Sequence, residues 1–181
     1  MIKVEIIKGN KISGKLLNFI NMQRKKDFEE NNDFIKKDHK DTLFFIIKAD
    51  GEVVSFGLLR NIKINYHKKN YYVKGIGGIL SVKKKKGFGK ILMKAMTNYL
   101  KETNQTGIGF CGSFVTPFYK KSGMKIKNNS ITKFFYIDPK TKKEFLGDDP
   151  ECDMIYIEGR DKFVSKILRT KERIQIPIPH W

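Results

Sequence analysis

The sequence is poor in cysteine and in acidic residues, and it contains no long hydrophobic run. Its two cysteines, Cys111 and Cys152, are too few for a disulfide framework and form no CxxC pair, so we expect both thiols to be reduced. No apolar stretch reaches the roughly 20 residues of a membrane-spanning helix. The first residues also lack the apolar core and small-residue cleavage site of a signal peptide. We therefore expect a cytoplasmic protein that makes no use of a membrane.

Acidic residues number 19 against 37 lysines and arginines, which gives a formal net charge of +18. An excess of this size favours polyanions: nucleic acid, an acidic membrane surface or a phosphorylated ligand. The lysines, however, are spread over the whole chain and acidic residues are interleaved with them. A composition rich in Lys, Asn and Ile also arises from genome coding bias. Charge alone therefore does not single out a nucleic-acid-binding protein.

The length and composition indicate a globular protein. The 181 residues can bury a sizeable core, and 40% of them are hydrophobic and 12% aromatic, which argues against disorder. There are no internal repeats and no linker rich in Gly and Ser. We expect residues 1–181 to form a single domain, in which 138–181 is a C-terminal extension.

The first half of the chain carries most of the strand signal. Residues 2–7 alternate as a strand, and 12–28 have apolar residues at helical spacing after Ser13, a candidate N-cap. The polar stretch 31–41 fits a short helix or a loop. A β-rich region follows, with turns at Asp50-Gly51 and at 67–70, and it predicts three antiparallel strands over 42–49, 52–65 and 71–82.

The second half alternates helices and short strands. Residues 89–103 form one apolar face at helical spacing, and 106–113 read as a short buried strand. Pro117 opens a short helix that Gly123 closes as its C-cap. The remaining chain predicts a late strand pair, 130–138 with 152–159, joined by a polar loop, and then a helical stretch with a Pro-rich end. This order predicts an α/β (α+β) domain built around a mixed sheet.

The stretch "GGILSVKKKKGFGK", residues 77–90, is the strongest candidate for a binding site. Gly87 and Gly89 allow the backbone to approach a ligand closely, and the helix that begins near Gly87 offers unpaired amides and a positive dipole end. Four lysines bring positive charge to the same turn. These features together predict a diphosphate site.

Two familiar phosphate-binding patterns do not apply. A Walker A loop is excluded because Gly78 has no glycine five residues later. The GxGxxG spacing in "GIGFCG", residues 107–112, lies within a predicted strand that does not run into a helix, so we interpret it as chance.

The segment "KKKGFG", residues 84–89, resembles the Q/R-x-x-G-x-G/A signature of the GNAT superfamily of N-acetyltransferases, with lysine in place of the first Gln or Arg. The preceding "GGILSV" resembles the splayed strand that pairs with the pantetheine arm of acetyl-CoA. Downstream, "FVTPFYKKSGM" resembles the family's FY-x-K-x-G-F segment. The resemblance spans about residues 1–137 and implies a GNAT-like mixed, mostly antiparallel central sheet flanked by helices.

The resemblance also implies an activity: transfer of an acetyl group from acetyl-CoA to a primary amine, by direct attack in a ternary complex and without a metal. Backbone groups of three strand residues would hold the pantetheine arm: Ile79, Leu80 and Ser81. The turn would bind the pyrophosphate through Lys84, Lys85, Lys86, Gly87, Phe88, Gly89 and Lys90. Tyr119 matches the phenol that protonates the departing thiolate, and an ordinary tyrosine pKa of about 10 suits that role.

Several features stay open. Residues 71–82 contain no carboxylate, so the general base could be Glu52, Asp153, the Trp181 carboxylate or water. The acceptor could be a small amine, an aminoglycoside or a protein amine, and a homodimer is left open. His39, His67 and His180 lack metal-ligand spacing.

An alternative from another class is a basic module that keeps this fold but binds RNA or DNA without catalysis. The sequence lacks the aromatic and basic interleaving of an RNP-type strand, and its lysines do not gather on one helix.

Overall fold

The computed structural model describes residues 1–28, 39–147, 149 and 151–178. Most of the predicted helix or loop at 31–41 lies outside these residues, as does Trp181. The chain forms two compact units: unit 1 comprises residues 1–60 and 77–96, and unit 2 comprises residues 61–76 and 97–181. Two long strands and one helix contribute residues to both units, and each unit is described separately.

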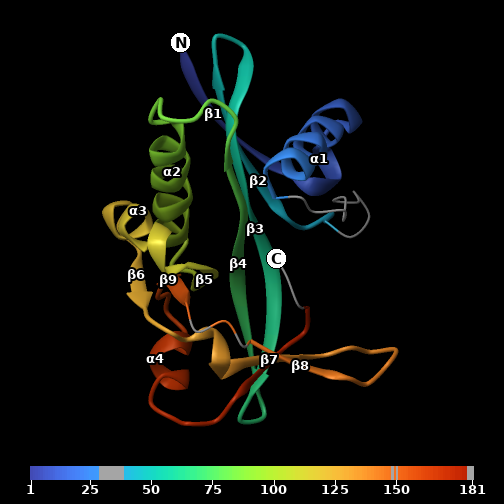
Figure 1. The fold of residues 1–181 in the computed structure, drawn as a ribbon, viewed down its shortest axis with the longest axis vertical. Helices are drawn as coiled ribbons and strands as arrows, with labels where there is room; N and C mark the ends of the chain where they lie inside the picture. Colours follow the sequence, from blue (N-terminus) through green and yellow to red (C-terminus); the bar gives the residue numbers. More distant parts are fainter. Residues whose placement is uncertain (29–38, 148, 150, 179–181) are drawn as a thin grey trace. The chain divides into compact units, whose positions relative to one another are not determined.

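The described residues contain a seven-stranded sheet with the order β1-β2-β3-β4-β5-β9-β6 and a three-stranded sheet with the order β10-β7-β8 (Figure 1). The first sheet is mixed and mostly antiparallel, with β4 and β5 parallel, as predicted. The strands are β1 (Ile2–Lys8), β2 (Leu43–Ala49), β3 (Glu52–Tyr66), β4 (Lys69–Ser81), β5 (Gly107–Gly112), β6 (Lys125–Lys127), β7 (Phe134–Ile137), β8 (Glu144–Leu146), β9 (Cys152–Ile157) and β10 (Ile174–Ile176). The helices are α1 (Gly14–Phe28), α2 (Phe88–Glu102), α3 (Thr116–Lys121) and α4 (Phe163–Ile167). No helix among the described residues is long and apolar enough to cross a membrane.

Unit 1 begins with the strands and turns that the sequence predicts. Asp50 and Gly51 have φ angles of 52° and 85°, the left-handed conformations that a two-residue hairpin between β2 and β3 needs. The Ser13 Oγ accepts a hydrogen bond from the Leu16 amide at 3.2 Å, which confirms Ser13 as the cap of α1.

Helices cover both faces of β2 and β3 in unit 1, with α1 on one side and α2 on the other (Figure 1). This explains why residues 43–47 of β2 are an unbroken apolar run, since they are largely buried on both faces. One face packs against α1 and against Ile12, two residues before it, in a cluster formed by Ile12, Leu17, Ile20, Phe44, Ile46, Phe56, Leu58 and Leu80.

The approach of α2 to the sheet depends on Gly57 in β3. A Cβ atom at this position would lie 2.6 Å from Ile79 Cδ1 and 3.1 Å from Met96 Sδ. The absence of a side chain at Gly57 therefore leaves the space that these two side chains fill, and this packing places the start of α2 next to the end of β4.

Unit 2 corrects the predicted late strand pair. The strand at 152–157 pairs with β5 and β6, whereas the strand at 134–137 pairs with β8 and β10. The two strands therefore belong to different sheets. The reason is local: residues 144–146 fold back on β7 as a short hairpin, and β9 buries three consecutive residues, Asp153, Met154 and Ile155, which requires neighbours on both sides and both faces.

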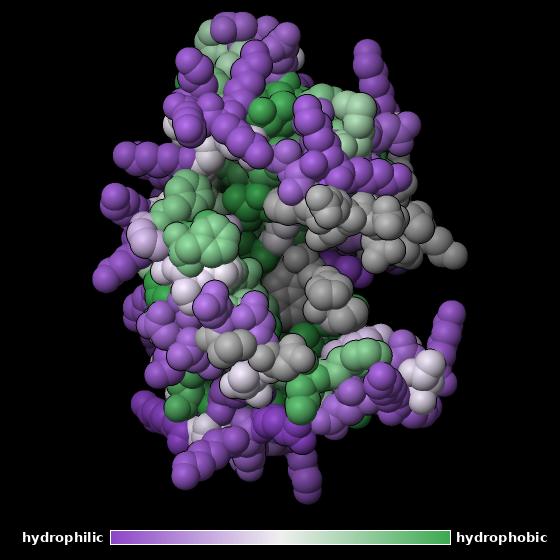
Figure 2. Space-filling model, in the orientation of Figure 1, coloured by the Kyte–Doolittle hydropathy of each residue, from purple (hydrophilic) through white to green (hydrophobic). Residues whose placement is uncertain are grey.

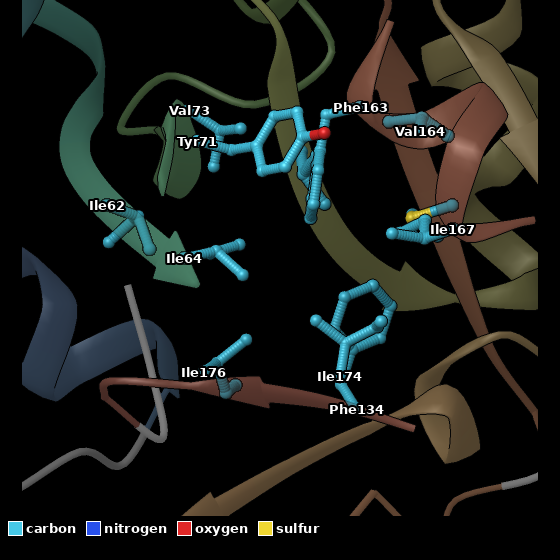
Figure 3. Packing of buried hydrophobic residues seen from close by; sticks show 12 residues of the cluster. Ile62, Ile64, Tyr71, Val73, Phe134, Phe163, Val164, Ile167, Ile174 and Ile176 are labelled. Atoms are coloured by element: carbon cyan, nitrogen blue, oxygen red, sulfur yellow. The ribbon is translucent and has the colours of Figure 1, made fainter. Parts of the chain in front are cut away.

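The core of unit 2 combines the distal part of the β3–β4 hairpin with the end of the chain. Figure 3 shows side chains of these segments pointing toward one another. The hairpin contributes Ile62, Ile64, Tyr71 and Val73; α4 contributes Phe163, Val164 and Ile167; and β7 and β10 contribute Phe134, Ile174 and Ile176. Tyr66 near the hairpin tip also contacts this region, since its hydroxyl lies 3.0 Å from Thr170 Oγ1.

Candidate active site

The turn between β4 and α2 lies in unit 1, and its backbone is accessible to a ligand. Lys85 and Gly87 have φ angles of 59° and 81°, so the chain passes twice through the left-handed region before the helix begins. A Cβ atom placed on Gly87 would meet nothing within 4 Å. The space in front of this residue is therefore open to a ligand, and glycine relieves the backbone strain that another residue would carry there.

Three backbone amides at this turn are available to an anion. The amides of Lys90 and Ile91 both donate to the Gly87 carbonyl, at 3.0 and 3.3 Å. Within the part of the chain that the structure describes, the preceding amides of Gly87, Phe88 and Gly89 have no acceptor. They lie at the positive end of the helix dipole, so the turn is suited to a phosphate group.

The four lysines of the turn differ in their surroundings. Lys83 Nζ lies 2.6 Å from Glu52 Oε2, and Lys84 Nζ lies 3.1 Å from Asp27 Oδ2 of α1. Lys85 and Lys86 are exposed and make no ion pair with any described residue. Carboxylates therefore already compensate two of the four lysine charges. One of the two belongs to Lys84, which occupies the first position of the Q/R-x-x-G-x-G/A signature.

Hydrophilic side chains are not confined to this turn. Hydrophilic side chains, many of them extended, cover most of the face visible in Figure 2, as 37 lysines and arginines require. Positive charge is a general property of this protein, and the turn is distinguished by its amides and glycines.

The strand residues Ile79, Leu80 and Ser81 lie at the end of β4, directly before the turn. The ladder between β4 and β5 contains two pairs, Lys74↔Gly107 and Gly75↔Ile108, and ends before these residues. The Leu80 carbonyl accepts a hydrogen bond from Ser55 Oγ at 2.8 Å, and Gly78 has a φ angle of 58°. The strand is thus irregular where the sequence predicts a ligand-binding edge.

Tyr119 belongs to unit 2, in α3, while the turn and residues 79–81 belong to unit 1. Pro117 lies in the first turn of α3 and Gly123 follows it with a φ angle of 85°, which confirms the predicted helix signals. Burial, and to a lesser extent the neighbouring Cys111, raises the pKa of Tyr119 to about 12. The phenol is therefore protonated at neutral pH and can act as a proton donor.

The candidates for a general base lie in very different settings. Asp153 is completely buried and accepts hydrogen bonds from Asn128 Nδ2 and the Asn129 amide, each at 2.9 Å. Its carboxylate holds the chain after β6 in place, a structural role. Glu52 is exposed and paired with Lys83. Among the described residues, no group of three or more His, Cys, Asp or Glu could hold a metal ion.

The glycines of "GIGFCG" serve packing. They lie in β5, followed by a 3-10 turn at 113–115, as expected for a strand and not for a dinucleotide loop. A Cβ atom on Gly107 would lie 2.5 Å from Leu100 Cδ1, and one on Gly109 would lie 2.9 Å from the Ile76 carbonyl oxygen. Gly109 requires glycine because a backbone oxygen approaches it closely, whereas at Gly107 the absence of a side chain leaves room for Leu100.

Sequence reasoning missed three residues that shape the turn: Asp27, Ser55 and Gly57. Gly57 could have been found, since an isolated glycine inside a strand indicates close approach of another element. Asp27 and Ser55 act through tertiary contacts that have no sequence signal. The exposed Phe114, with 87% of its surface accessible, was also not anticipated.

Comparisons with known proteins identify the fold. Neither a scan against protein-family models nor a search of curated proteins found a match. A search of solved structures found Escherichia coli ElaA at 13% identity and a TM-score of 0.62, covering 87% of this chain and 100% of that one. An acyl-CoA N-acyltransferase from Pseudomonas aeruginosa matches at 13% identity and 0.57, over 86% and 99% of the two chains. Campylobacter jejuni N-acetyltransferase PseH in complex with acetyl coenzyme A matches at 18% identity and 0.52, over 87% and 99%.

These similarities lie below 25% identity and concern the fold. The chain has the fold of GNAT-type N-acetyltransferases, as its two sequence segments predicted.

Proposed function

We propose that this protein is an acetyl-CoA-dependent N-acetyltransferase that moves an acetyl group to a primary amine. The observation that carries the proposal is the turn before α2. Three backbone amides of this turn have no acceptor among the described residues, and two of its lysines are exposed. The space in front of Gly87, in the same turn, is open. The fold supports the proposal, because solved structures with this fold include N-acetyltransferases, one of them in complex with acetyl coenzyme A.

In this proposal the turn holds the pyrophosphate of acetyl-CoA. The amides of Gly87, Phe88 and Gly89 donate to phosphate oxygens, and Lys85 and Lys86 add charge that needs no fixed geometry. Lys84 and Lys90 lie at the two ends of this pyrophosphate-binding segment. The chemistry of the site fits a diphosphate, since it combines donors with positive charge and offers no carboxylate that would repel the ligand within residues 84–90.

The backbone of Ile79, Leu80 and Ser81 would pair with the pantetheine arm. The end of the β4–β5 ladder at Gly75 supports this role, because the strand residues that follow are not engaged in that ladder. The Ser55 bond to the Leu80 carbonyl holds the strand from the β3 side and occupies one of the two lone pairs of that oxygen.

Tyr119 would act as the general acid. When the amine nitrogen attacks the thioester carbonyl, the carbon–sulfur bond breaks and the leaving sulfur takes up a proton. A phenol with a pKa of about 12 is protonated at neutral pH and can donate to the sulfur as negative charge develops there. Because the ordinary pKa of a thiol is about 8.5, the Tyr119 phenolate must regain a proton from solvent to complete the transfer. The amine must also lose a proton, and no side chain of the described residues stands out for that step, so water and the Trp181 carboxylate stay the candidates for it.

The activity is tested by following free thiol release from acetyl-CoA with a panel of amines. The panel should include small amines, an aminoglycoside, a lysine-containing peptide and a peptide with a free N-terminus. Release that depends on both protein and amine supports the proposal. Failure of acetyl-CoA, up to millimolar concentration, to raise the melting temperature would sink it, since a ligand that binds the folded state must stabilise it.

The same thermal titration with a mixed oligonucleotide tests the alternative function. A shift with the oligonucleotide and none with acetyl-CoA would assign the protein to the nucleic-acid-binding class.

A further inference from the structure

Strand β1 forms an edge of the seven-stranded sheet and lies entirely in unit 1. It pairs with β2 without a break, from Ile2↔Ala49 to Lys8↔Leu43. No described strand pairs with its other edge. The strand is seven residues long and contains no proline and no register shift, so it lacks two of the usual devices that stop an edge from pairing with another chain.

The backbone groups at this open edge belong to the even-numbered residues. The Gly9 amide donates to the Thr42 carbonyl at 2.8 Å, and the Asp50 amide donates to the Met1 carbonyl at 3.2 Å. In an antiparallel ladder, residues that bond to the partner strand alternate with residues whose groups point away from it. Odd residues of β1 therefore face β2, and the N–H and C=O groups of Ile2, Val4 and Ile6 point to the open edge.

The same three residues present an exposed apolar row. Ile2, Val4 and Ile6 have 52%, 43% and 48% of their surfaces accessible. They lie on the α2 face of the sheet, because they are opposite Ala49, Ile47 and Phe45 in the ladder. On the other face Ile7 packs against the α1 core, so the apolar residue of that face is covered. The described residues therefore leave this row uncovered.

The charges of β1 are arranged to match a second copy of itself. Lys3 and Glu5 lie on the α1 face, 2.9 Å apart between Nζ and Oε1. Hydrogen bonds from Lys48 and from Lys3 lower the pKa of Glu5, so that its carboxylate is ionised at neutral pH. When two such strands run antiparallel about a two-fold axis at Val4, each Lys3 comes to lie opposite the partner's Glu5.

We propose that two copies of this chain pair through β1 in an antiparallel register centred on Val4, which continues the sheet of unit 1 across a two-fold axis. In this register Val4 exchanges two hydrogen bonds with the partner's Val4, and Ile2 exchanges two with the partner's Ile6. The apolar rows of both strands then lie side by side and cover each other.

Neighbouring registers are less favourable. A two-fold axis at Lys3 or at Glu5 places two like charges directly opposite each other, which destabilises an antiparallel pair. An axis at Ile6 leaves Lys3 without an acidic residue opposite it. The charge pattern thus selects the register centred on Val4, and this inference does not depend on the proposed acetyl transfer.

A cysteine scan tests this register. In the proposed pair the two Val4 Cα atoms lie about 5.5 Å apart, within reach of a disulfide. In the variants Ile2→Cys and Ile6→Cys, the introduced cysteine and its copy in the partner lie four residues apart along the paired strands, a distance of roughly 13 Å. We expect Val4→Cys to form a covalent dimer under mild oxidation in non-reducing electrophoresis. The two control variants and the native protein, with its half-buried Cys111 and Cys152, should stay largely uncrosslinked.

Sedimentation of the native protein provides a second, independent measurement. We expect a concentration-dependent dimer that Val4→Lys and Lys3→Glu both weaken at least tenfold, with unchanged melting temperature of the monomer. A monomer at every concentration overturns the proposal. Cross-linking strongest at position 2 or 6 overturns the register, and a dimer that neither variant weakens places the interface elsewhere.

Discussion

The turn before α2 and the segment around Tyr119 carry the two parts of the family resemblance, and they are built in opposite ways. The turn is exposed, and its binding groups are backbone amides that need an empty space and a permissive residue, Gly87. The Tyr119 phenol is a side chain whose property comes from burial, which raises its pKa. An exposed site made of amides tolerates changes of side chain but not of backbone. A site made of one buried group depends on that group alone.

The largest effect is expected at Gly87. Gly87→Asp places a carboxylate and a Cβ in the open space before the three amides, and should abolish measurable acetyl-CoA binding by calorimetry. Gly87→Asn is the matched control, because asparagine has the same shape and tolerates a positive φ without the charge. We expect it to bind about tenfold more weakly than the native protein. Equal affinities for both variants and the native protein would show that the pyrophosphate lies elsewhere.

The second effect concerns turnover. Tyr119→Phe removes only the phenolic proton and should lower kcat about 100-fold, the usual contribution of a general acid, while acetyl-CoA affinity stays within twofold. Tyr156→Phe is a matched control in the same unit, since burial also raises the pKa of that tyrosine. Its kcat should be unchanged. A native kcat in Tyr119→Phe would assign the proton to water or to another group.

The third effect is on alkaline stability. Tyr119 has a higher pKa in the folded chain than its ordinary value of 10, so between pH 10 and 12 the folded state binds more protons than the unfolded state. Stability is therefore full below pH 10 and falls as the pH rises toward 12, by up to about 3 kcal/mol from this group. Urea unfolding from pH 8 to 11.5 should show a shallower fall for Tyr119→Phe. Parallel curves would contradict the burial of the phenol.

The smallest effects are expected from the lysines. Lys85→Ala and Lys86→Ala should each weaken acetyl-CoA binding two- to fivefold at low salt, and the difference should shrink at 0.5 M salt because exposed charges are screened. Lys84→Ala should have less effect, since Asp27 compensates its charge. Asp27→Asn should tighten binding by about twofold. If Lys84→Ala proved the most harmful of the three, the Asp27 pair would be irrelevant to the site.

Local signals predicted the elements around both regions well. The Asp50-Gly51 hairpin, the Ser13 cap, Pro117 and Gly123 each act within a few residues, so their sequence patterns are sufficient. The predicted pairing of the two late strands was wrong because pairing is a long-range choice. Nothing in "CDMIYIEG" distinguishes β7 from β5 as a neighbour, and the outcome depends on which partners bury both faces of β9.

The sequence by itself determined the order of strands and helices from β1 to α3, the glycine-rich turn, and the pattern of apolar residues on α1 and α2. These properties follow from backbone preferences and from the spacing of apolar residues, which act locally. Only the tertiary structure decided that Asp27 compensates Lys84, that Gly57 makes room for Ile79 and Met96, and that the Tyr119 phenol is buried enough to hold its proton. Each of these depends on atoms brought together from distant parts of the chain, and burial and charge act through space, not along the sequence.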